Sequence, residues 1–194
     1  MYFKKGRWIS IWYQIQEITK EKPTSILDVG AGNGVLGFFL KTQANVKYTS
    51  LDINKGDYID IVADARKIPL EDKSFDLVCS FQTLEHLPYE DAMKALREMK
   101  RVTRNKIIIS LPHSGRGTYM DIKLPFIKKI KWFYWKSSNN DHKYNGLHYW
   151  ELGTKQVSVK KFKKDIEQRF GLKIERDFKV FEKPYYHFFI LKGI

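Results

Sequence analysis

The spacing of apolar residues changes several times along the chain, and each change marks an expected element. Near the N-terminus the apolar positions recur every three to four residues, which predicts an amphipathic helix over residues 8–20, stopped before Pro23. Short apolar runs then alternate with helical stretches. The expected elements are strand 25–29, helix 33–42, strand 46–51, strand 59–63, strand 75–81, helix 90–102 and strand 107–111. Such alternation is typical of a parallel sheet with helices on its faces.

The regular alternation stops at Pro112 and returns near residue 158, so residues 112–157 are expected to form an insertion. Within it, a basic and aromatic helix is predicted to pack its apolar face on the sheet ends as a lid, with contact to a membrane surface or to nucleic acid as the alternatives. Its face consists of Phe126, Ile127, Ile130, Phe133 and Tyr134. A helix over residues 158–170, capped by Ser158 and ended by Gly171, and a hairpin from Leu172 to Leu191 are expected to close the chain.

These elements predict one doubly wound α/β domain with a lid insertion. It divides into an N-terminal helix (1–23), a ligand-binding core (24–111), the insertion (112–157) and the closing helix and hairpin (158–194). Of the 194 residues, 43% are hydrophobic and 29% charged, which is typical of a soluble globular protein. No apolar run is long enough to span a bilayer, and polar residues interrupt the stretch that a signal peptide needs.

Cysteine and histidine usage limits the chemistry further. Cys79 is the single cysteine, so no intramolecular disulfide can form and a reducing, cytoplasmic setting is expected. The five histidines are dispersed along the chain, so no metal site of the zinc type is expected.

The net charge of +13 is concentrated in the second half of the chain. Residues 1–99 hold 13 basic and 14 acidic side chains, whereas residues 100–194 hold 22 and 8. Such asymmetry indicates either an anionic partner or a solvated lysine-rich face. The anionic partner could be nucleic acid, the acidic lipid of a membrane surface or a phosphorylated metabolite. Because 27 of the 35 basic residues are lysine, and arginine is the side chain that binds phosphate in a bidentate way, both interpretations stay open.

Candidate binding residues lie where the expected strands end. The segment ILDVGAGNG, residues 26–34, is a strand followed by a glycine-rich turn that opens a helix, and free N–H groups there favour a carboxylate. It departs from the dinucleotide fingerprint because Val35 stands where a third glycine is required. Asp52 ends the second strand, where a carboxylate can accept hydrogen bonds from ribose hydroxyls. Asp64, Gln82 and His113 also fall at carboxyl ends of strands.

Four motifs in this order resemble the class I S-adenosylmethionine-dependent methyltransferases, in particular the type-11 group. They are ILDVGAGNG at 26–34, LDI at 51–53, ADARKIPL at 63–70 and SFDLVCSFQTLEHLP at 74–88. The resemblance covers residues 25–111 and extends more loosely to the end of the chain. It implies a Rossmann-like, mostly parallel seven-stranded sheet with an antiparallel last strand. The short segment between Asp52 and Ile59 implies that one outer helix of the family is missing.

The resemblance also implies roles for individual residues. Asp28 is expected to support the turn. The methionine end of S-adenosylmethionine is implied to lie along Gly30, Gly32 and Gly34. The ribose of this cofactor is implied to lie at Asp52 beside Ile53, and its adenine at Asp64 and Ala65. Phe81 and Gln82 are implied to border the sulfonium. Glu85 and His86 are implied to lie near the acceptor.

The expected reaction is transfer of a methyl group from S-adenosylmethionine to an oxygen or nitrogen of a small-molecule or lipid-like acceptor. A histidine suits the role of general base, and His86, followed by His148, is the candidate. An RNA-modifying enzyme is the alternative, although SFQT stands where base-amino methyltransferases have an Asp/Asn-Pro-Pro-aromatic motif, and Cys79 lies inside an expected strand. A non-catalytic cofactor-binding module and an NAD-dependent oxidoreductase also stay open.

Overall fold

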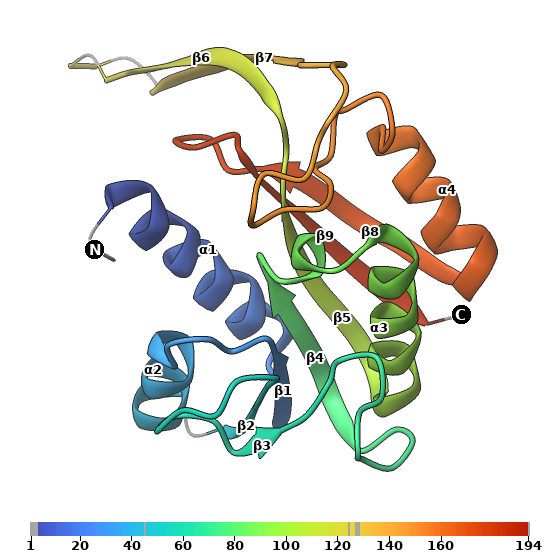
Figure 1. The fold of residues 1–194 in the computed structure, drawn as a ribbon. Coiled ribbons are helices and arrows are strands. Elements are labelled where there is room, and N and C mark those ends of the chain that lie inside the picture. Colours follow the sequence, from blue (N-terminus) through green and yellow to red (C-terminus); the bar gives the residue numbers. More distant parts are fainter. Residues whose placement is uncertain (1–3, 45, 124, 127–128, 194) are drawn as a thin grey trace.

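The computed structural model describes residues 4–44, 46–123, 125–126 and 129–193. A seven-stranded sheet forms its centre, in the order β3-β2-β1-β4-β5-β9-β8 (Figure 1). The strands are β1 (Ser25–Val29), β2 (Lys47–Asp52), β3 (Ile61–Val62), β4 (Phe75–Phe81), β5 (Thr103–Pro112), β8 (Leu172–Lys179) and β9 (Tyr186–Gly193). The five neighbouring strands β3, β2, β1, β4 and β5 pair in parallel, whereas β9 is antiparallel to both β5 and β8. The predicted Rossmann-like, single-domain fold is confirmed.

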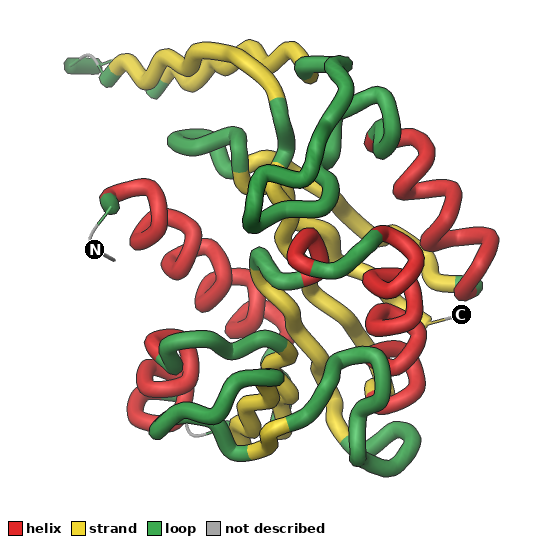
Figure 2. The backbone as a smooth tube through the Cα atoms, in the orientation of Figure 1, coloured by secondary structure: helices red, strands yellow, loops and turns green. Residues whose placement is uncertain are grey.

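Helices cover both faces of the sheet (Figures 1 and 2). α1 (Lys5–Glu21) and α2 (Val35–Gln43) lie over one face, where Ile18 and Leu40 pack with Phe188 of β9. α3 (Tyr89–Val102) and α4 (Val159–Phe170) lie over the other, where Leu96 and Phe162 pack together with strand residues. The central strands are therefore buried on both sides, which explains their continuous apolar runs. No helix in the described part of the chain has the length and apolar content needed to cross a bilayer.

Local sequence signals set the ends of several elements. The Ser158 Oγ accepts a hydrogen bond from the Lys161 N–H at 3.1 Å and caps α4, and Gly171 ends that helix with φ 58°. Between β2 and β3 the backbone forms turns and bends without a helix, as the short segment there implies. The Asp60 carboxylate accepts a hydrogen bond from the Ser50 N–H at 2.8 Å and holds this connection against β2.

The prediction of a basic and aromatic helix in the insertion is wrong. The segment is strand β7 (Ile130–Ser137), which pairs antiparallel with β6 (Gly115–Ile122) in a separate two-stranded ribbon. Five of the six residues 130–135 are β-branched or aromatic, a composition that favours strands. Gly117 lies opposite Trp135, and a Cβ at Gly117 would come within 2.9 Å of that indole. Ile127 and Lys128 lie outside the described residues.

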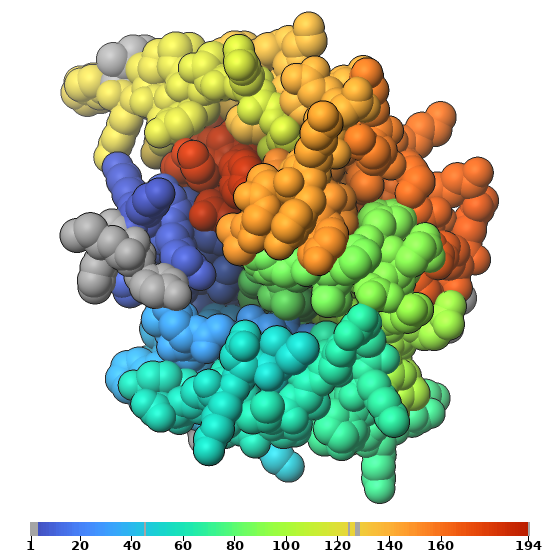
Figure 3. Space-filling view, viewed as in Figure 1, coloured from blue at the N-terminus to red at the C-terminus, as the bar shows by residue number. Residues whose placement is uncertain are grey.

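The ribbon does not cover the sheet ends. It projects from the body of the molecule (Figures 1 and 2), and most of its side chains are exposed. Phe181, in the β8–β9 turn, contacts the ring of Tyr119 at a centroid distance of 5.3 Å and the Lys131 Nζ at 4.9 Å. The sheet ends are covered instead by the loop over residues 138–157, whose Trp150 and Leu152 are buried. Figure 3 shows this loop, in orange, resting on the green residues that follow β4.

Candidate functional site

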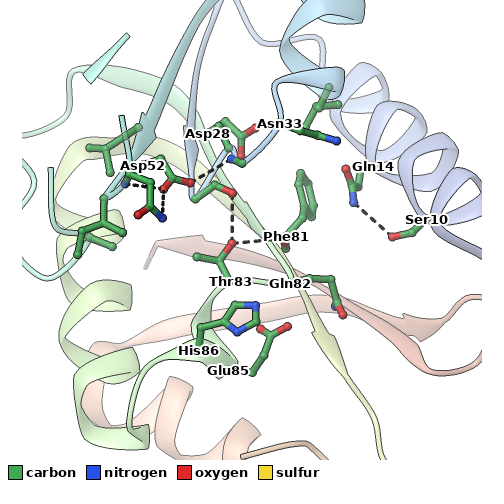
Figure 4. Close-up of a pocket in the computed structure, with 18 of the residues that line it drawn as sticks. Ser10, Gln14, Asp28, Asn33, Asp52, Phe81, Gln82, Thr83, Glu85 and His86 are labelled. Carbon is green, nitrogen blue, oxygen red and sulfur yellow. Dashed lines mark hydrogen bonds between the residues drawn. The ribbon is translucent and has the colours of Figure 1, made fainter. Parts of the chain in front are cut away.

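A cavity of about 760 Å³ lies at the carboxyl ends of β1, β2 and β4, which is where open α/β sheets bind ligands. Most of the residues selected from the sequence line it, and Figure 4 shows part of its wall. They are Asp28, Gly30, Gly32, Asp52, Ile53, Asp64, Ala65, Phe81, Gln82, Glu85, His86 and His148. Gly34 and His113 are not among the lining residues.

The glycine-rich turn after β1 forms the floor of the cavity. Gly30 has φ 80°, and a Cβ there would lie 2.2 Å from the side chain of Thr83, so this position requires glycine. The N–H of Gly30 donates to the Leu51 carbonyl at 2.7 Å. The N–H of Gly32 donates to the Asp52 Oδ2 at 3.0 Å. These bonds tie the turn to the end of β2. Gly34 faces away, against the side chain of Tyr58.

Asp28 lies buried beneath this turn. Its Oδ2 accepts a hydrogen bond from the Tyr48 hydroxyl at 2.5 Å, and its Oδ1 lies 3.6 Å from the Cys79 Sγ. Burial raises the pKa of Asp28 to about 6 because the charged form loses its hydration. Asp28 therefore links β1 to its two neighbouring strands directly below the cavity.

Two further carboxylates line the cavity beyond β2 and β3. The Asp52 Oδ1 accepts a hydrogen bond from the Asn54 N–H at 2.9 Å. With one backbone donor on each oxygen, the Asp52 carboxylate is fixed in orientation and retains lone pairs for a ligand. Asp64 is held by Arg66 at 2.6 Å, and this guanidinium lowers the pKa of Asp64. Arg66 also binds Asp91 of α3 at 2.7 Å.

The backbone turns sharply after β4, on the opposite side of the cavity. Gln82 has φ 54°, a conformation that costs a non-glycine residue about 1 to 3 kcal/mol and is found most often at functional sites. Its N–H donates to the Ser110 carbonyl at 2.9 Å and its side-chain Nε2 to the Ser110 Oγ at 3.3 Å. Neighbouring β5 thus holds Gln82 at the cavity wall.

The one-turn helix η1 (Leu84–His86) and the loop of residues 138–157 meet next to Gln82. The Tyr149 N–H donates to the Glu85 carbonyl at 2.9 Å, and the Trp150 Nε1 donates to the Leu87 carbonyl at 3.0 Å. His86 and His148, far apart in the sequence, have ring centroids 5.1 Å apart. Glu85, which precedes His86, is fully buried, and burial raises its pKa to about 8, with the charge of Glu151 adding to the effect.

Several lining residues were not selected from the sequence. Ser10 and Gln14 of α1 reach the cavity, where the Gln14 Nε2 donates to the Ser10 Oγ at 3.2 Å. The structure buries both on one face of α1, but the spacing of the apolar residues does not single out these two polar side chains. Tyr185 and Tyr186, at the start of β9, also line the cavity. Nothing local distinguishes them from other strand residues, because only the antiparallel return of β9 brings them there.

His113 was expected beside the other strand-end residues, and this expectation is wrong. The residue directly follows β5, but its side chain is buried away from the cavity. Its Nδ1 lies 3.0 Å from the His187 Nδ1, and its Nε2 lies 2.8 Å from the Ser137 Oγ of β7. His113 therefore joins the ribbon to the sheet. Its direction follows from the pleat, which points successive side chains to opposite faces.

Comparison with known proteins agrees with this geometry. Residues 27–110 match a family model described as a methyltransferase domain. The malonyl-[acyl-carrier protein] O-methyltransferase of Geobacter sulfurreducens is 31% identical over 119 residues, which cover 54% of this chain and 44% of that protein. Across four curated relatives, the match covers between 34% and 58% of the relative's own length.

Solved structures share the fold at low sequence identity. The Burkholderia thailandensis 1,6-didemethyltoxoflavin-N1-methyltransferase, crystallised with 1,6-didemethyltoxoflavin and S-adenosylhomocysteine, superposes with a TM-score of 0.64 and 12% identity, over 93% of this chain and 75% of that one. The magnesium protoporphyrin IX methyltransferase of Synechocystis PCC 6803, solved with bound SAM, gives a TM-score of 0.60 and 14% identity, over 97% and 79%. At this identity the likeness shows the fold alone.

Proposed function

We propose that this chain, whose residues 27–110 match the methyltransferase domain model, is a class I S-adenosylmethionine-dependent methyltransferase of the type-11 group that transfers a methyl group to an oxygen or nitrogen of a small-molecule or lipid-like acceptor. One observation carries the proposal. A single cavity joins the glycine-rich turn and Asp52 to a second cluster of polar side chains at Glu85, His86 and His148. It therefore has room for a cofactor and an acceptor side by side.

The residues present fit S-adenosylmethionine. Gly32 borders open space, since a Cβ there would meet nothing closer than the Gly30 carbonyl at 4.0 Å. The first turn of α2 carries no acidic side chain, so its N–H groups and positive dipole end can receive a carboxylate. The fixed Asp52 carboxylate would accept hydrogen bonds from ribose hydroxyls. The cofactor supplies an electrophilic methyl group on a sulfonium.

The acceptor end of the cavity has groups that can take a proton. A hydroxyl or protonated amine must lose a proton as it becomes a nucleophile. The Nδ1 of His86 lies 2.9 Å from the Leu147 carbonyl, and the Nδ1 of His148 lies 2.8 Å from the Glu151 Oε1. Each of these two oxygens favours the histidine form with the proton on Nδ1, which leaves the Nε2 lone pair available. His86 and His148 are thus the proposed bases, and Gln82 borders the reacting centre.

The nucleic-acid alternative has its own observation. The ribbon exposes Trp132 and Tyr134 on a segment rich in lysine, a combination that suits stacking on bases beside phosphates. Against cytosine carbon methylation, Cys79 is fully buried and burial raises its pKa well above the ordinary range, so it is not the required nucleophile. Steep salt dependence of RNA binding would favour this alternative, and binding to anionic vesicles would favour a membrane surface.

Calorimetry tests the proposal directly. S-adenosylhomocysteine should bind at one site per chain, and NAD should not bind, which separates a methyltransferase from an oxidoreductase. Incubation of fractionated small molecules, lipids and RNA with methyl-labelled cofactor should then label a small-molecule or lipid fraction. Binding without any transfer would indicate a non-catalytic module. We place this activity in a reducing, cytoplasmic setting, which suits a single buried thiol.

A further inference from the structure

The proposed methyl transfer leaves one buried carboxyl group unexplained. Glu85 is 0% exposed, and in the described part of the chain neither of its carboxylate oxygens has a hydrogen-bond partner. It nevertheless lines the cavity, close to His86 in Figure 4. A buried carboxylate without a partner is costly unless it is protonated or faces a cation. The site therefore either keeps a proton on Glu85 or receives a cation that comes from outside the chain.

Two histidines converge on the same point. One potential ligand atom each from Glu85, His86 and His148 lies within 4.8 Å of the other two. Ligand atoms that share one ion at about 2.1 Å lie roughly 3 to 4 Å apart. A small rotation of the exposed His86 side chain would close this difference. The three side chains thus stand close to the separation that a metal ion requires.

The hydrogen bonds of both histidines orient them as metal ligands. The Leu147 carbonyl lies 2.9 Å from the His86 Nδ1, and the Glu151 carboxylate lies 2.8 Å from the His148 Nδ1. With the proton on each Nδ1, both Nε2 lone pairs are free to bind a cation. A carbonyl or carboxylate behind the distal nitrogen is the usual outer support of a metal-bound histidine.

The geometry points to a site for one divalent transition-metal cation, bound by the Glu85 carboxylate and the Nε2 atoms of His86 and His148. Two imidazoles and one carboxylate suit Zn²⁺ or its neighbours in the first transition row, whereas Mg²⁺ and Ca²⁺ prefer oxygen ligands. Three protein ligands leave at least one position open. The histidines' dispersion along the chain argued against a metal, but the loop of residues 138–157 removes that separation in space.

The open position deepens the proposed function, on which this step rests. The cation would lie at the acceptor end, next to Gln82, and would bind an acceptor oxygen and lower the pKa of its hydroxyl. The hydroxyl releases its proton to water. The oxygen then forms a bond to the methyl carbon as the carbon–sulfur bond breaks and sulfur keeps the electron pair. His86 and His148 would act as ligands rather than as bases, and the acceptor would be an oxygen nucleophile.

Cobalt titration tests the site without any acceptor. Tag-free, chelator-treated protein should bind one equivalent of Co²⁺ with a visible d–d absorption, which Zn²⁺ displaces and excess Mg²⁺ does not. Glu85→Gln and His148→Asn should each weaken Co²⁺ binding at least 100-fold. Glu151→Gln should weaken it about 10- to 100-fold by removing the outer support. The matched control Glu167→Gln, on the exposed side of α4, should bind Co²⁺ like the unchanged protein.

Glu85→Gln keeps the side-chain shape and removes the buried charge, so this variant is expected to fold. Zn²⁺ should raise the melting temperature of the unchanged protein and leave that of Glu85→Gln unaltered. Absence of saturable Co²⁺ binding, or equal affinity in Glu85→Gln and Glu167→Gln, would overturn the metal site. S-adenosylhomocysteine binding, measured in the same samples, decides the proposed function separately, because Glu85 and His148 lie apart from the turn at residues 30–34.

Discussion

The two sides of the cavity are built in different ways. On the cofactor side, the N–H groups of the turn at residues 30–34 donate to the Leu51 carbonyl and to the Asp52 carboxylate, which fixes the turn to the end of β2. On the acceptor side, η1 is met by the loop of residues 138–157, and long-range contacts such as that of Trp150 with Leu87 hold the two together. The polar groups of the cofactor side bond to one another, whereas Glu85 on the acceptor side has no partner among the described residues. The cofactor side, whose polar groups are hydrogen-bonded, thus faces an acceptor side where the Glu85 carboxylate is left to bind something else.

Removing the anchor of the acceptor side should have the largest effect. Trp150 is 3% exposed and contacts the rings of Tyr89 and Phe162. We expect Trp150→Ala to lower the free energy of unfolding by about 3 to 5 kcal/mol, as measured by urea denaturation. Tyr149→Ala is the control, because Tyr149 is 45% exposed, and it should change stability by about 1 kcal/mol or less. A similar loss in both variants would show that this loop is not anchored at Trp150.

Removing the fixed carboxylate of the cofactor side should act on binding more than on folding. We expect Asp52→Ala to weaken S-adenosylhomocysteine binding by about 1 to 3 kcal/mol, since charge-assisted hydrogen bonds to the ribose would be lost. Titration calorimetry provides the measurement. Asp57→Ala, in the exposed segment after β2, should bind the ligand normally. Unchanged affinity in Asp52→Ala would show that the ribose does not lie at this position.

Acid should affect two buried side chains, Asp28 below the cavity and His113 outside it, in opposite directions. Burial raises the pKa of Asp28 to about 6 and lowers that of His113 to about 3. Between about pH 6 and pH 4.5, Asp28 takes up a proton in the folded protein but not in the unfolded chain, which stabilises the fold as the pH falls. In the same interval the unfolded chain alone binds a proton at His113, which destabilises the fold as the pH falls.

Two variants separate these contributions. Asp28→Asn removes the stabilising one, so its stability should fall more steeply with acid than that of the unchanged protein. His113→Asn should fall less steeply. Each slope should change by up to about 1.4 kcal/mol per pH unit, the value for one proton. Urea midpoints measured through this interval test both signs, and parallel slopes in all three proteins would contradict the assignment of the two pKa shifts.

The smallest effect is expected at the ribbon, which belongs to neither binding end. Trp132 is 51% exposed, so Trp132→Ser should change the free energy of unfolding by about 0.5 kcal/mol or less. Affinity for S-adenosylhomocysteine should stay the same. If the ribbon binds RNA, the same variant should weaken RNA binding, because one stacking surface is lost. A marked fall in cofactor affinity would instead show that the ribbon reaches the cavity.

The cofactor side could be predicted from local sequence for a physical reason. Its residues follow directly on buried strands, and parallel strands bring their carboxyl ends to one edge of the sheet. Asp52 and Gly30 therefore meet at the edge that the order of elements implies. Even there, the sequence did not distinguish Gly30 and Gly32, which line the cavity, from Gly34, which faces Tyr58. That difference depends on the path of the backbone after the turn.

The amino-acid sequence by itself indicated the core strands, the parallel character of the sheet and the cofactor end, because periodicity, strand ends and glycine turns are local properties. Only the tertiary structure decided which side chains lie on the acceptor side of the cavity. Residues 130–135 have apolar positions compatible with either a helix or a strand, and pairing with β6 selects the strand. His148 reaches Glu85 and His86 only because Trp150 and Tyr149 fix a long loop against η1. Contacts between residues so far apart in sequence depend on packing energy, which no local pattern encodes.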